Sequence, residues 1–176
     1  MGWRGSSPKA KSGVARMQHH LVVVREQYLK LLLSGHKRIE CRLSAIRRAP
    51  YQAVAEGDLL WFKLSSGPVL AVAVVERAES RTSDSGADLV RWVKSHDRLI
   101  HAEPAFYSDA ADWVRFATLV WLKAVIAIRP MRISKTDQRA WVALKNAPRP
   151  GMRIDSANDV ALAAKGPSSR RPRTPE

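Results

Sequence analysis

Three ionisable residues, Lys37, Glu40 and Arg42, lie close together in a stretch where apolar residues would be expected. Arginine offers a planar fork of N–H donors that suits phosphate or a base edge, and lysine supplies a point charge. Glutamate can orient the arginine, accept a hydrogen bond from an exocyclic amine, or act as a general base when burial raises its pKa. Two cations around one carboxylate predict an anion site. The alternative is a buried ion-pair network that fixes strand register.

The segment before this cluster predicts a strand followed by a short helix. Residues 21–24 are apolar and largely β-branched, which is typical of a buried strand. Residues 26–34 carry their apolar side chains over one broad side, as in a short amphipathic helix. Gly35 follows the last apolar residue, where glycine most easily supplies a left-handed C-terminal cap. The cluster therefore begins directly after a helix end.

The cluster itself overlaps a predicted strand. Ile39, Cys41 and Leu43 alternate with Glu40 and Arg42, and a period of two marks a half-buried strand. The three apolar residues are expected in the core, where Cys41 acts as a small packing residue rather than as a nucleophile. Glu40 and Arg42 are expected on the opposite face, with Lys37 on the incoming turn.

Short strands dominate the rest of the chain. Strands are expected at 59–64 and 69–75, joined by a glycine-containing turn, and again at 116–128 and 140–144, with Pro130 ending the third or placing it on an edge. Short helices are expected at about 87–95 and 109–113, and residues 77–85 are polar. This order predicts an α+β fold that is mainly β: a small barrel with a helix after its first strand and one or two short helices in a later excursion.

A formal net charge of +14 predicts attraction to polyanions, most commonly nucleic acid. Residues 1–18 contribute +4 and residues 147–176 contribute +3, which leaves +7 for the remainder. Both ends lack an apolar pattern. We therefore expect a disordered basic tail at 1–17, one domain at 18–146 and a second disordered basic tail at 147–176. Met17 is a candidate for the true start.

Several classes of protein are disfavoured. A single cysteine allows no intramolecular disulfide and no cysteine zinc cluster, so a reducing cytoplasm is the expected location. The longest apolar run, 117–128, is too short to span a bilayer. The histidines lack the spacing of a zinc helix, and there is no P-loop, dinucleotide fingerprint or serine elbow. We expect no metal, no cofactor and no membrane.

Further candidate residues surround the cluster in the sequence. Arg47, Arg48 and Tyr51 lie in the loop after the predicted strand, where the cations could touch phosphate and the ring could stack on a base. Lys63 and Ser66, at the predicted hairpin, are weaker candidates. The strand tryptophans are instead expected in the core: Trp61, Trp121 and Trp141.

Gly35, Lys37, Glu40 and Arg42 reproduce a Gly-x-Lys-x-x-Glu-x-Arg pattern that resembles the signature of the ASCH family, a branch of the PUA-like superfamily. The resemblance extends over roughly residues 18–145 and includes the hairpin, residues 50–51 and residues 139–141. It implies a barrel of five or six strands with a cleft beside the signature strand. Members of this family are proposed to bind RNA or other nucleic acid; one small relative deacetylates N4-acetylcytidine and another is reported to cleave RNA.

The resemblance departs at one position from the deacetylating relative. That pattern has a catalytic threonine three positions after the motif lysine, and this chain has Glu40 there. The leading hypothesis is therefore an RNA-preferring nucleic-acid-binding domain whose cleft receives a nucleotide or a nucleotide-like small molecule. The alternatives are a hydrolase of acylated cytidine-type nucleosides or a ribonuclease, with Lys37 and Glu40 as acid and base, and a protein-interaction domain. The sequence leaves the oligomeric state open.

Overall fold

The computed structural model describes residues 17–155, and its main element is a six-stranded sheet in the order β2-β5-β4-β3-β1-β7. The elements in chain order are β1 (His19–Val24), α1 (Glu26–Leu33), β2 (Ile39–Ser44), β3 (Leu59–Leu64), β4 (Val69–Thr82), α2 (Gly86–Lys94), α3 (Asp97–Ile100), α4 (Pro104–Ser108), β5 (Phe116–Met131), β6 (Ser134–Lys135), β7 (Trp141–Leu144) and β8 (Arg153–Ile154). This is an α+β fold, mainly β, as the sequence predicts.

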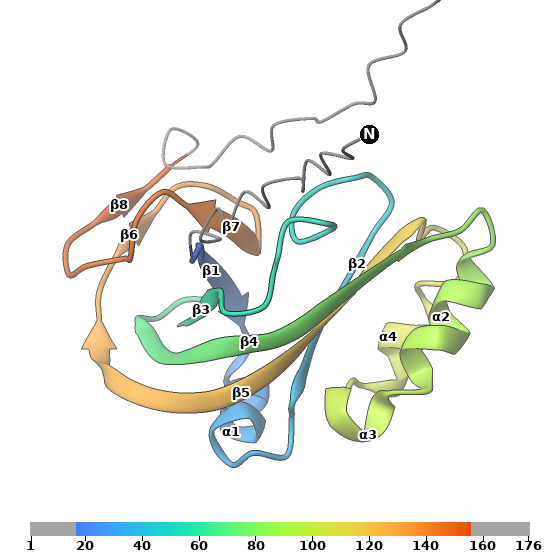
Figure 1. Ribbon diagram of the computed structural model, residues 1–176, viewed down its shortest axis with the longest axis horizontal. Coiled ribbons are helices and arrows are strands. Elements are labelled where there is room, and N and C mark those ends of the chain that lie inside the picture. Colours follow the sequence, from blue (N-terminus) through green and yellow to red (C-terminus); the bar gives the residue numbers. More distant parts are fainter. Residues whose placement is uncertain (1–16, 156–176) are drawn as a thin grey trace, which may run out of the picture.

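The sheet curls into a half-barrel. β1 pairs with β3 in parallel, and the other neighbours in the sheet are antiparallel. β4 and β5 are long and run side by side across the molecule (Figure 1). Their pairing contains several register shifts, and Ala124 of β5 has a φ of +52°. Bulges of this kind increase the local twist, which lets one long strand pair belong to both halves of a curled sheet.

Three apolar clusters hold these layers together. Leu32 of α1 packs with Phe62 and other residues inside the curl of the sheet. Ile39 of β2 packs with Val93 of α2 in a second cluster, which fixes α2, α3 and α4 against β2 and β5. The third cluster lies where β1 and β7 meet β8 and includes the fully buried Ile154. We call the segment from α2 to α4 the helical excursion. In Figure 1 it lies at one end of the molecule, and β6 and β8 lie at the other.

Two strands are longer than predicted. β4 was expected to end at residue 75 but continues to Thr82, because residues 77–82 pair with residues 116–121 of β5. β5 runs beyond its predicted end at residue 128 and includes Pro130, which lies in an irregular part of the ladder between the pairs Val69↔Met131 and Ala71↔Ala127. A proline, which lacks an N–H, is tolerated at such a point.

The excursion and the C-terminal boundary also need correction. The excursion holds three helices, since α3 and α4 form in residues 97–108, where no periodicity was visible, and residues 109–113 form turns. Helices of four and five residues are too short to carry a periodic signal. The domain boundary at residue 146 was placed too early, because β8 pairs with β6 and buries Ile154. Of the tails predicted at 1–17 and 147–176, residues 1–16 and 156–176 lie outside the described residues.

A buried polar cluster supports the first strand. The indole Nε1 of Trp141 donates to Nδ1 of His20 at 3.2 Å, so Nε2 of this histidine carries the proton that Asp58 accepts, also at 3.2 Å. Asp58 further accepts the backbone N–H groups of Gln18 and Ala55, at 2.9 and 2.8 Å. Burial opposes ionisation of Asp58, but these hydrogen bonds outweigh it and lower the pKa of the carboxyl group.

We expect Asp58→Ala to lower the free energy of unfolding by about 2–3 kcal/mol, because three buried or part-buried donors lose their acceptor. Since the pKa of Asp58 is lowered by folding, its contribution is present above the ordinary carboxyl range and is lost as the pH falls through the lowered pKa. Urea unfolding of wild type and Asp58→Asn between neutral and acid pH measures this. The exposed Asp88→Ala is the control, and an equal acid dependence in Asp58→Asn would contradict the assignment.

Candidate functional site

The signature residues form a buried ion-pair network at the start of β2. The left-handed φ of Gly35, +77°, ends α1 and turns the chain toward this strand. The Nζ atom of Lys37 lies 3.6 Å from Oε2 of Glu40, and Nη2 of Arg42 lies 2.7 Å from Oε1 of the same carboxylate. Lys37 and Glu40 are almost fully buried, at 4% and 5% exposed. Glu40 thus joins the two cations.

Lys37 is held by several further contacts. Its ammonium group donates to the carbonyl oxygens of Ile39, at 2.9 Å, and Ile100, at 2.7 Å, and lies 5.4 Å from the centroid of the Tyr28 ring. The ammonium group therefore makes two hydrogen bonds to carbonyls and one ion pair with a carboxylate. Because Ile100 ends α3, this lysine ties the helical excursion to the beginning of β2.

Arg42 reaches from β2 to β1 and β7, two strands that are not paired with β2. Its Nη2 atom also donates to the carbonyl oxygen of Val23 in β1, at 3.0 Å, and its guanidinium carbon lies 5.6 Å from the centroid of the Trp141 ring in β7. The Nε atom of Arg42 is buried and has no hydrogen-bond partner among the described residues. An arginine with an unused buried donor therefore bridges the open side of the half-barrel.

Two cavities meet at Arg42, which lines both. The larger, called here the α4 cavity, has a volume of about 490 Å³ and lies between β1, β2 and the loop and helix around α4. The smaller, the β7 cavity, has a volume of about 290 Å³ and lies between β2, the following loop and the chain entering β7. Lys37 and Glu40 line the α4 cavity, and Arg48 and Tyr51 line the β7 cavity. The predicted cleft is thus divided by one side chain.

Not every candidate residue reaches these cavities. Arg47 lines neither: its guanidinium lies 5.6 Å from the Tyr51 ring and donates to Gln52 at 2.6 Å. Lys63 is also outside both; it is buried, it donates to the carbonyl of Leu64, and burial lowers its pKa. Ser66 is exposed in the turn between β3 and β4. Lys63 and Ser66 therefore lie at the β3–β4 hairpin, as predicted, but this hairpin does not bring them to either cavity.

The predicted separation of faces holds along β2. Ile39, Cys41 and Leu43 pack toward α2, α3 and α4, whereas Glu40 and Arg42 reach the opposite side. Burial raises the pKa of the Cys41 thiol to about 12, which leaves little thiolate near neutral pH and agrees with a packing role.

Sequence reasoning missed several cavity residues. The α4 cavity is also lined by Phe106 and by Trp113, which is 45% exposed. The β7 cavity includes Thr118 of β5 and Arg139. Thr118 is a polar residue in an apolar strand and Arg139 immediately precedes the Ala140-Trp141 pair, so weak signals existed. Neither signal identified a partner, because the contacts join distant segments.

Among the described residues no helix is long and apolar enough to cross a membrane. The sequence matches no protein-family model and no curated protein. Its structure is similar to the crystal structure of ASCH from Zymomonas mobilis, with a TM-score of 0.51 and 22% identity over 64% of this chain and 71% of that chain. A mutant form of the same protein gives a TM-score of 0.52 at 21% identity, covering 65% of this chain and 75% of that one.

These similarities define the class of fold: a small α+β domain, mainly β, with a curled half-barrel sheet. More particularly, it has the fold of an ASCH domain, as the signature at Gly35–Arg42 predicts.

Proposed function

We propose that this chain is a cytoplasmic nucleic-acid-binding ASCH-domain protein that prefers RNA and receives one nucleotide of a single strand in the two cavities that meet at Arg42. The observation that carries the proposal is that Arg42 lines both cavities and that its side chain is 23% exposed there. An arginine held by Glu40 and Val23 and still partly exposed to two hollows is placed to bind an anion. The preference for RNA rests on the resemblance of the signature to the ASCH family.

Cations and aromatic rings suit the β7 cavity to the backbone of a nucleotide. Arg48 lines it, and no described residue makes an ion pair or hydrogen bond with its guanidinium. Together with Arg42 it can bind a phosphate by paired N–H donors. The rings of Tyr51 and Trp141 form apolar walls beside these cations. A phosphate there could accept a hydrogen bond from Nη1 of Arg42, which donates to no described residue.

The α4 cavity suits a base. Tyr28, Phe106 and Trp113 line it, and flat apolar rings of this kind stack on bases without a strong sequence preference. Glu40 faces the same cavity, and its oxygens, which form ion pairs with Lys37 and Arg42, keep lone pairs that can accept a hydrogen bond. An exocyclic amine is the matching donor. Splayed single-stranded bases are read in this way by many RNA-binding folds.

The geometry favours binding over acid–base hydrolysis. The ammonium group of Lys37 donates to two carbonyls and forms an ion pair with Glu40, so the protein itself engages this group and does not direct it at a ligand in the α4 cavity. Glu40 stands where the deacetylating relative has its hydroxyl. The protein-interaction alternative has no observation of its own in the described residues, and the titration below separates it from nucleic-acid binding.

Arg48→Ala is expected to weaken binding of a short single-stranded RNA about fivefold and to lower the slope of log affinity against log salt by about 0.7, because one phosphate contact is lost. Fluorescence titration at several salt concentrations, with DNA of the same sequence in parallel, measures both. Arg129→Ala, at an exposed position of β5 outside both cavities, is the control. Binding that is absent or insensitive to salt would sink the proposal.

A further inference from the structure

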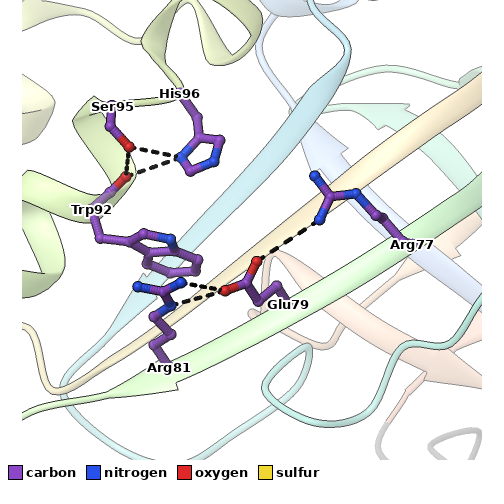
Figure 2. Close-up of polar contacts among 6 residues, drawn as sticks. All are labelled: Arg77, Glu79, Arg81, Trp92, Ser95 and His96. Carbon is purple, nitrogen blue, oxygen red and sulfur yellow. Dashed lines mark hydrogen bonds and ion pairs between the residues drawn. The ribbon is translucent and has the colours of Figure 1, made fainter.

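A second group of cations lies on β4, away from both cavities. Arg77, Glu79 and Arg81 alternate along this strand and lie side by side on the face that meets α2, as Figure 2 shows. The guanidinium carbon of Arg77 lies 3.4 Å from the centroid of the Trp121 ring, and that of Arg81 lies 4.3 Å from the centroid of the Trp92 ring. We call these five residues the arginine–tryptophan array. None of them lines either cavity.

A histidine holds the two indoles in place. The ring of His96 lies edge-on to Trp121 at 5.5 Å and to Trp92 at 6.0 Å. Its Nδ1 lies 3.0 Å from the carbonyl oxygen of Trp92, an atom that can only accept, so Nδ1 carries the proton (Figure 2). Trp121 is 7% exposed and its place is fixed by the β2–β5–β4 ladder. Each arginine is therefore stacked on a ring that is itself held.

Stacking alone does not use the hydrogen-bonding capacity of these arginines. The side chains of Arg77 and Arg81 remain 56% and 50% exposed. Arg77 makes no hydrogen bond to any described residue, and its nearest carboxylate, Glu79, is 3.8 Å away. Arg81 directs Nε and Nη2 to Oε1 of Glu79, at 2.9 and 2.6 Å, which leaves Nη1 pointing to no described acceptor. Both guanidinium groups are thus held in position by the indoles, and each keeps N–H donors that no described residue uses.

Ordered donors of this kind match a phosphate backbone. Arginine binds phosphate through paired N–H groups, and a side chain already held in place loses less entropy when it binds. Arg77 and Arg81 are four residues apart on one strand, so their backbones are separated by about 13 Å. That spacing is suited to two phosphates of one extended strand rather than to a single small anion. Glu79, between them, is an acceptor that such a backbone would replace.

We infer that the arginine–tryptophan array is a second contact for single-stranded RNA, which binds the phosphate backbone of a strand whose nucleotide occupies the cavities. The inference rests on the proposed function for the identity of the ligand. Arg77 is the main contact because its donors are unused, and Glu79 limits affinity by competing for Arg81. The array contributes affinity without sequence preference, since it contacts backbone and not base edges.

The test compares a dinucleotide with a single-stranded RNA of about 20 nucleotides, long enough to leave the cavities. Arg77→Ala is expected to weaken binding of the long strand about tenfold, to lower its salt slope by about 0.7, and to leave dinucleotide binding unchanged. Glu79→Gln is expected to strengthen binding of the long strand about fivefold, the factor for removing one carboxylate close to phosphate in water. A purely structural array predicts no gain from Glu79→Gln.

Arg91→Ala is the matched control, because Arg91 lies in α2, is exposed, and is paired with Asp88 at 2.7 Å but stacks on no ring of residues 17–155. If this variant loses as much affinity as Arg77→Ala, the effect is bulk charge and the inference is overturned. It is also overturned if polyglutamate of equal charge displaces the long RNA as well as RNA itself does, since the surface then binds acidic protein. Thermal melting confirms that each variant is folded.

The outcomes separate the two proposals. Dinucleotide binding that persists while Arg77→Ala leaves the long strand unaffected refutes the array alone. The opposite pattern refutes the cavity proposal and leaves the array as the contact. In that pattern the dinucleotide does not bind, and the affinity for the long strand depends on Arg77 but not on Arg48.

Discussion

Lys37→Met is expected to lower the free energy of unfolding by about 3–5 kcal/mol, the cost of breaking a buried ion pair by removing one partner. The substitution leaves the carbonyls of Ile39 and Ile100 without their donor and leaves Glu40 with one counter-charge in place of two. The hydrogen bond that links the end of α3 to the start of β2 is lost as well. Urea unfolding at neutral pH measures the loss, and hydrogen exchange is expected to increase first in the helical excursion.

Two further variants distinguish a buried network from general charge loss. In Lys37→Met/Glu40→Leu the carboxylate is removed together with its partner, so part of the lost stability is expected to return. In Lys30→Met the ion pair with Glu26 is broken on the exposed side of α1, where both side chains are at least 70% exposed, and the unfolding midpoint should hardly change. An unfolding midpoint for Lys37→Met equal to that of Lys30→Met would contradict the network.

The period of two along β2 correctly predicted which side chains of this strand face the core and which face the opposite side. It assigned Ile39 and Cys41 to the core and Glu40 and Arg42 to the other face, and the packing of this strand agrees. Local periodicity is informative here because alternation and burial are decided within one strand. The helix before it was also predictable, because its amphipathic pattern and terminal glycine lie within ten residues of one another.

Contacts between distant segments were beyond such reasoning. Arg42 meets Val23 and Trp141, which come from β1 and β7, and no local pattern joins these positions. Arg77 and Arg81 belong to a stretch that is polar in sequence, yet they form a strand because β5 supplies a ladder and the indole of Trp121, while α2 supplies the indole of Trp92. In both cases the polar residue finds its partner in the folded chain, where tertiary packing overrides local propensity.

Arg42→Ala is expected to weaken binding of short single-stranded RNA about a hundredfold, the factor for two charge-assisted hydrogen bonds. The substitution removes the cation shared by both cavities, opens the wall between them, and leaves the carbonyl of Val23 without its donor. Fluorescence titration measures the affinity, and thermal melting establishes that the variant remains folded.

Arg42→Lys tests whether charge alone suffices. A lysine at this position keeps the positive charge, but one ammonium group cannot contact Glu40 and Val23, cover the ring of Trp141 and also donate into the wall between the cavities. We therefore expect it to recover less than a tenth of the lost affinity. Arg38→Ala, an exposed position in the same segment, is the control and should bind nearly as wild type does. If folded Arg42→Ala or Arg42→Lys binds RNA as tightly as wild type, Arg42 does not contact the ligand, and the two cavities would lose their common binding residue.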